Sequence, residues 1–108
     1  MNAARAEVCA GCDTPLSNHA RLAAYPAYLF NRGLAEARAG RLARARDLFA
    51  AVVHWCPLDV EARNALALAN FELGDTEEAR RHWNEVVTKQ PDNPFATQGL
   101  ERLKAPAP

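Results

Sequence analysis

The side chains best suited to chemistry lie in the segment CAGCDTPLS, residues 9–17. Cys9 and Cys12 are two residues apart, a spacing at which two thiolates from one tight turn can bind the same metal ion. Zinc takes four ligands in a tetrahedral shell, with sulfur at about 2.3 Å. The remaining ligands would come from Cys56 and from either His19 or His54. One structural Zn²⁺ held by these side chains is therefore one interpretation of the segment.

The same segment resembles half of a zinc-ribbon knuckle, because a turn residue and then Pro-Leu follow the second cysteine. Such a site would attach residues 1–25 to the rest of the chain and would leave no coordination position open for catalysis. Two alternatives stay open. Cys9 and Cys12 could form a redox-responsive pair, although that chemistry is typical of a strand–helix context. They could also lie in a tail, with Cys56 as a small buried apolar side chain.

No other group of residues has the spacing of a catalytic site. The chain lacks a Ser/His/Asp set, a glycine-rich phosphate loop and paired carboxylates at usable spacing. His82 neighbours Arg80 and Arg81 and is expected to be exposed, and Trp55 is expected to pack against the helices that follow it. We therefore expect a protein that is not an enzyme.

The elements that must position these residues follow from an internal repeat with a period of 34 residues. The stretches GRLARARDLFAAVVHWCP and GDTEEARRHWNEVVTKQP align without a gap. Their small, aromatic and apolar positions recur at the spacing of one helix face. The equivalent pairs are Gly40 and Gly74, Ala45 and Ala79, Arg46 and Arg80, Phe49 and Trp83, Val52–Val53 and Val86–Val87, and Pro57 and Pro91.

The residues at the ends of these stretches predict where helices begin and end. Gly40 and Gly74 lie between two helices, where a positive φ is often needed. Pro57 and Pro91 end the second helix of each pair because proline has no amide hydrogen. Asp59 is a favourable N-cap for the helix that follows. The sequence thus predicts helices at 27–39, 42–54, 60–73, 76–89 and 94–104, with a separate short helix near 18–24.

This pattern resembles the tetratricopeptide repeat family, whose unit is a pair of antiparallel helices. The second helix of each pair matches well, whereas the first helices depart from the family's Trp, Leu, Gly and Tyr positions. Those positions hold Leu29, Arg32, Gly33 and Glu36 in repeat one, and Arg63, Leu66, Ala67 and Asn70 in repeat two. The resemblance implies an all-α fold, a short α-solenoid of antiparallel helix hairpins. Its expected parts are a cysteine-containing segment 1–25, repeats 26–59 and 60–93, a capping helix 94–104 and a tail 105–108.

In proteins of this family the first helices line a concave groove that holds a peptide or a helix. Carried over to this chain, the resemblance implies an apolar partner-binding groove and a role as an adaptor for another protein. Binding of a chaperone C-terminus is disfavoured, because Phe30 and Leu34 replace the Lys and Asn that such binding needs. Alternatively, residues 1–25 could fill the groove. The expected groove residues are Phe30, Leu34, Arg38, Asn64, Leu68, Phe71 and Gln98, flanked by Ala27, Ala37, Glu61, Glu72, Phe95 and Arg102.

Charge and composition limit the partners further. Lys+Arg and Asp+Glu each number 13, so no general attraction to nucleic acid or anionic lipid is expected. The absence of an apolar run long enough for a membrane span, and of a secretory signal, favours a cytoplasmic protein. Eleven arginines against two lysines, with abundant alanine, suggest a GC-rich bacterial genome. Residues 32–46 are mainly basic and 59–85 mainly acidic, which would permit head-to-tail assembly into a homo-oligomer.

Overall fold

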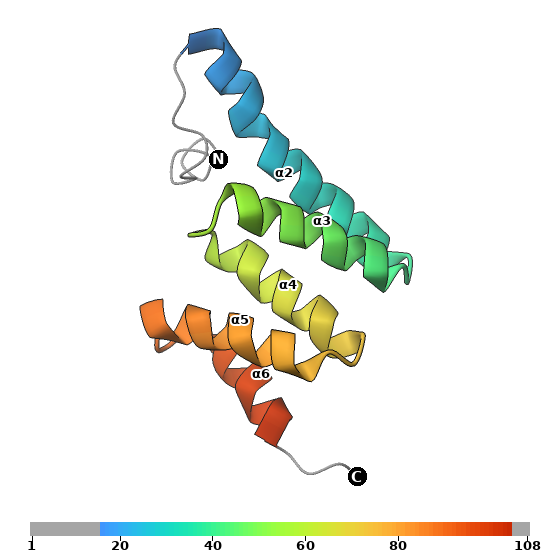
Figure 1. The fold of residues 1–108 in the computed structure, drawn as a ribbon, viewed down its shortest axis with the longest axis vertical. Helices are drawn as coiled ribbons and strands as arrows, with labels where there is room; N and C mark the ends of the chain where they lie inside the picture. The colour runs from blue at the N-terminus through green and yellow to red at the C-terminus, as the bar shows by residue number, and fades with distance from the viewer. Residues whose placement is uncertain (1–15, 105–108) are drawn as a thin grey trace.

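A computed structural model describes residues 16–104, with side chains placed from Tyr25 onward. Five helices account for most of this range, and the described residues contain no strand. Each helix packs against the next along the chain, so that two hairpins and a final helix form a stack with α2 at one end and α6 at the other (Figure 1). The helices are α2 (Leu16–Arg38), α3 (Leu42–Trp55), α4 (Val60–Glu72), α5 (Thr76–Lys89) and α6 (Pro94–Lys104). The predicted all-α solenoid is confirmed.

The turns within the two hairpins have the predicted backbone. Gly40 has a φ of 85° and Gly74 a φ of 91°, both in the left-handed region that glycine adopts without strain. Between the hairpins, Asp59 caps α4 by accepting a hydrogen bond from the backbone N–H of Ala62 at 3.0 Å. The helix boundaries therefore follow from local residue chemistry.

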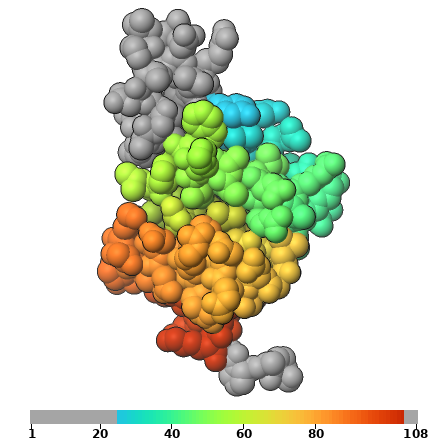
Figure 2. Space-filling view, in the orientation of Figure 1, coloured from blue at the N-terminus to red at the C-terminus, as the bar shows by residue number. Residues whose placement is uncertain are grey.

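The core repeats with the same period as the sequence. Ala45, Phe49 and Val52 of α3 are each at most 3% exposed. Their equivalents in α5, Ala79, Trp83 and Val86, are at most 2% exposed. The first set belongs to an apolar cluster that α2 and α4 share with α3, and the second set to a cluster that α4 and α6 share with α5. The hairpins follow one another as layers along the long axis of the molecule (Figure 2). An alanine at the crossing point lets the two helices of a hairpin approach closely.

The first helix is longer than the sequence predicted. A break was expected between a short helix near 18–24 and a second helix from 27, but α2 is continuous through Pro26, so the expected boundary at 25/26 falls inside it. A proline inside a helix removes one hydrogen bond and crowds the carbonyl four residues earlier, at a cost of about 3 kcal/mol, yet α2 does not end at Pro26. Pro26 is buried within this helix.

At the other end of the stack, α6 covers the second hairpin. Asn93 caps it by accepting hydrogen bonds from the backbone N–H groups of Phe95 and Ala96, at 3.1 and 3.0 Å. Gly99 lies flat against the Trp83 ring, and a Cβ atom at this position would overlap that ring. Within residues 16–104, no helix has the length and apolar character needed to cross a bilayer.

Candidate functional site

A hollow in the described part of the chain lies along the first helices of the hairpins. It has a volume of about 690 Å³ and runs between α2, α4 and α6, with Trp83 of α5 at its base. The lining residues are Phe30, Val60, Glu61, Asn64, Ala65, Leu68, Trp83, Asn93, Phe95, Gln98, Gly99 and Arg102. We call this hollow the α2–α4–α6 groove.

Two large apolar side chains of the groove remain in solvent. Leu68 of α4 is 43% exposed and Phe95 of α6 is 69% exposed. Phe30 and Trp83 also line the groove, but both are almost fully buried and belong to the hydrophobic core. The apolar surface available to a partner is therefore provided mainly by α4 and α6.

Two asparagines connect the walls of the groove. Asn93 Oδ1 already accepts the capping hydrogen bonds of α6, and Asn93 Nδ2 donates to Gln90 Oε1 at 3.0 Å. Asn64 must therefore present its amide nitrogen, which donates to Asn93 Oδ1 at 3.2 Å. This orientation leaves Asn64 Oδ1 buried without a hydrogen-bond donor among the described residues. The asparagine pair thus joins α4 to the start of α6.

The structure brings four of the seven predicted groove residues to the groove: Phe30, Asn64, Leu68 and Gln98. The other three lie elsewhere. Leu34 is partly buried against the core of the first hairpin, and Arg38 is exposed but outside the lining. Phe71 packs against the Trp83 ring, with ring centroids 6.0 Å apart. Among the flanking positions, Glu61, Phe95 and Arg102 line the groove, whereas Ala27, Ala37 and Glu72 do not.

The groove is also lined by five residues that were not predicted from the sequence: Val60, Ala65, Trp83, Asn93 and Gly99. The helix assignment itself carried a signal for Gly99. A glycine within a helix is unfavourable unless a neighbour needs its space, and here the Trp83 ring occupies that space.

Phe71 lies outside the groove lining but contacts one of its residues. The guanidinium of Arg102 lies over the Phe71 ring, with its central carbon 4.5 Å from the ring centroid. A cation over an aromatic face is attracted by the electrons of the ring. This contact holds the one arginine of the groove lining in a defined position beside Leu68 and Gln98.

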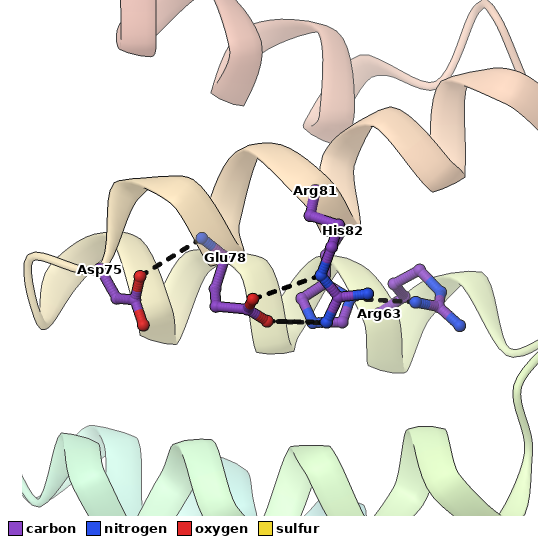
Figure 3. Close-up of polar contacts among 5 residues, drawn as sticks. All are labelled: Arg63, Asp75, Glu78, Arg81 and His82. Atoms are coloured by element: carbon purple, nitrogen blue, oxygen red, sulfur yellow. Dashed lines mark hydrogen bonds and ion pairs between the residues drawn. The ribbon is translucent and has the colours of Figure 1, made fainter.

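A second cluster of polar side chains lies on the other side of α4, where α4 and α5 meet (Figure 3). His82 of α5 is 5% exposed, so the expectation that it would be exposed is wrong. Arg63 of α4 donates from Nη1 to His82 Nδ1 at 2.9 Å. Because Nδ1 accepts, the neutral ring carries its proton on Nε2, which faces Glu78 Oε1 at 3.6 Å. Burial lowers the pKa of His82, and the nearby Arg81 and Arg63 lower it further.

The same cluster explains how repeat two tolerates an arginine at the family's tryptophan position. Arg63 is partly buried and also donates to the carbonyl of Pro57 at 3.1 Å. Its side chain therefore links α4 to α5 and to the preceding turn. Glu78 in turn binds Arg81 at 2.7 Å, a contact that lowers the pKa of Glu78. The interactions of this cluster join neighbouring elements of the repeat.

The exposed aromatic rings at the start of the first hairpin were not anticipated. Tyr25 and Tyr28 stack with centroids 6.2 Å apart, and the Trp55 ring meets Tyr25 edge-on at 6.4 Å. Trp55 was expected to contact the following helices, but these ring contacts are to α2, the preceding helix, and it is 38% exposed.

The structure does not test the expected zinc site. Cys9 and Cys12 lie outside the described residues, as does the side chain of His19. Cys56 is buried and disulfide-bonded, so its sulfur is not a thiolate in this structure, and His54 is exposed beside Trp55. No group of three or more His, Cys, Asp or Glu side chains in the described range could hold a metal ion. A Zn²⁺ site in the reduced chain stays a prediction.

Comparison with known proteins bears on the repeat. A sequence profile described as tetratricopeptide repeat matches residues 36–103, and a second profile of the same description matches residues 16–54. No curated protein and no solved structure matches the chain. Together the two profiles cover both hairpins and nearly all of α6, and no profile match supports the likeness of residues 9–17 to a zinc ribbon.

Proposed function

The chain belongs to the tetratricopeptide repeat family, and we propose that it is a non-catalytic protein–protein interaction module. In this proposal an apolar segment of another polypeptide occupies the α2–α4–α6 groove. The observation that carries the proposal is the exposure of Leu68 and Phe95 on the wall of a preformed hollow. Apolar side chains grouped at a concave surface are typical of a binding site.

The form of the groove favours a polypeptide as the occupant. Its walls come from three parallel layers of the stack, so it is extended across the repeats. An extended peptide or one face of a helix presents apolar side chains at regular intervals, and such side chains could fill the spaces beside Leu68 and Phe95. Trp83 and Phe30 form a rigid base because the core holds them. A preformed site lowers the entropic cost of binding.

The proposal is tested by placing charge on the exposed apolar wall. Linear peptides selected from a random library on the wild-type protein provide the probes. In the double variant Leu68→Glu with Phe95→Glu, two buried apolar contacts would become desolvated carboxylates. We expect affinity for the selected peptides to fall more than about a hundredfold. Fluorescence polarisation measures the affinity, and circular dichroism checks that the helices persist.

The matched control is Leu58→Glu with Leu73→Glu, which places the same charges on exposed leucines outside the groove. This control should bind the peptides as the wild type does. Full affinity in the groove variant, or equal loss in the control, would contradict the proposed site.

A further inference from the structure

Arg102 is the cation of the groove lining, and the fold presents it to the occupant. Its guanidinium is stacked on Phe71 at 4.5 Å, and it forms no ion pair with an acid of the described residues. Stacking uses the face of the guanidinium and leaves the N–H groups at its edge directed outward. Such an edge can donate two parallel hydrogen bonds to one carboxylate.

Most arginines of the described chain are already paired with acids of their own repeat. Arg38 and Arg44 have no such pair, but neither lines the groove, and Arg63 bonds to His82 and Pro57. Arg102 therefore differs from the other arginines in being both placed in the groove and without an acidic partner in the described range. The paired arginines are Arg32 and Arg41 with Glu36, Arg46 with Asp47, Arg80 with Glu77 and Arg81 with Glu78.

None of the acids near the groove forms an ion pair with Arg102 within the described residues. Glu61 lines the groove at the start of α4, ten residues before Phe71, which corresponds to about 15 Å along a helix. Glu72 follows Phe71 but is not part of the lining, and Glu101 lies 3.8 Å from Lys104. The apolar wall of Leu68 and Phe95 thus lies beside a cation with no acid in the lining next to it.

We infer that the occupant of the groove is an acidic apolar peptide, in which an Asp or Glu side chain binds Arg102 next to a large apolar side chain at Leu68 and Phe95. This inference rests on the proposed function and adds the chemistry of the partner. The inference is based on charge complementarity. A peptide without an acidic side chain would partly cover the guanidinium of Arg102 and leave it without a hydrogen-bond acceptor.

The test uses the same selected peptides. We expect them to be enriched in Asp or Glu close to Leu, Ile, Phe or Trp. For one such peptide, replacing the acid by its amide should weaken binding to the wild type about tenfold, the usual effect of losing a charge-assisted hydrogen-bonded pair. The variant Arg102→Gln should bind the acidic peptide about tenfold more weakly and should no longer distinguish it from the amide peptide. Arg102→Lys should recover part of the discrimination, since a lysine keeps the charge but not the paired donors.

Arg44→Gln is the matched control, because it removes an exposed arginine outside the groove. It should discriminate between the two peptides as well as the wild type does. The inference fails if selected peptides lack acids, or if Arg102→Gln discriminates as the wild type does while Leu68→Glu with Phe95→Glu still abolishes binding. In those cases the groove remains a binding site for neutral peptides. If the groove double variant retains full affinity, the proposed function fails and this inference fails with it.

Discussion

The turns of the two hairpins share an equivalent backbone hydrogen bond, but the polar side chains at the two turns make different contacts. In the first, Arg41 N–H donates to the carbonyl of Glu36 at 2.9 Å, and one period later Asp75 N–H donates to the carbonyl of Asn70 at 2.8 Å. The side chains of these pairs differ. Glu36 is a buried carboxylate bound by the Arg41 side chain, whereas Asn70 is a buried neutral amide.

The second helices of the two hairpins also begin differently. The Asp75 carboxylate caps α5 by accepting a hydrogen bond from the N–H of Glu78 at 3.3 Å. Arg41 provides no such cap for α3, because a guanidinium carries only hydrogen-bond donors, and its side chain binds Glu36 instead. The repeat therefore specifies the backbone of both hairpins, while the hydrogen-bond partners of the polar side chains differ from one hairpin to the other.

The apolar core should not distinguish the two hairpins. Phe49→Ala and Trp83→Ala remove aromatic rings that are 3% and 2% exposed at equivalent positions. Each should lower the free energy of unfolding by about 3–5 kcal/mol, through lost burial and the cavity that remains. Urea unfolding followed by circular dichroism measures the loss. A loss of unfolding free energy below about 1 kcal/mol in either variant would show that the two rings do not contribute equally to stability.

The polar groups should distinguish the hairpins. Arg63→Ala removes the donor to His82 and to the Pro57 carbonyl, and it leaves a buried ring nitrogen without a partner. We expect a loss of about 1–3 kcal/mol. Arg32→Ala in the first hairpin removes an exposed arginine 3.9 Å from Glu36, and its effect should stay within about 0.5 kcal/mol. If urea unfolding gave the same loss of free energy for Arg63→Ala and Arg32→Ala, this expected difference between the hairpins would be contradicted.

The smallest expected effects appear as two separate steps in the pH dependence of stability. Burial lowers the pKa of His82 in the folded protein, so unfolded chains bind the proton first. Stability from the second hairpin is therefore fully present above pH about 6.5, the ordinary pKa of histidine, and is lost as pH falls below it. The hydrogen bond from Arg41 lowers the pKa of Glu36. Stability from the first hairpin is lost only below pH about 4.3, the ordinary pKa of glutamate.

Variants assign the two steps. His82→Gln should remove the decline that begins below pH 6.5, and Glu36→Gln should reduce the decline at lower pH. Glu78 contributes to the lower step as well, because Arg81 lowers its pKa. The free energy of unfolding in urea, measured from pH 8 to pH 3, gives both steps. An unchanged upper step in His82→Gln would show that the buried histidine does not control it.

The sequence alone determined the repeat and the ends of most helices. Glycine at positive φ, proline after a helix and aspartate or asparagine at an N-cap act through the backbone within a few residues. Gly40, Gly74 and Asp59 therefore have their predicted roles. The equivalent core positions of α3 and α5 could also be found, because burial of one helix face imposes the period of the helix on the sequence.

Only the tertiary structure decided which side chains of those helices are available to a partner. Leu34, Phe71 and Leu68 are all apolar residues on first helices, yet only Leu68 lines the groove. The burial of His82 likewise depends on Arg63, nineteen positions earlier in the chain. Local sequence does not encode such relations directly, since exposure and hydrogen bonding at a helix surface depend on the helix packed against it. The period of the chain specified the stack, and the packing between its layers specified the site.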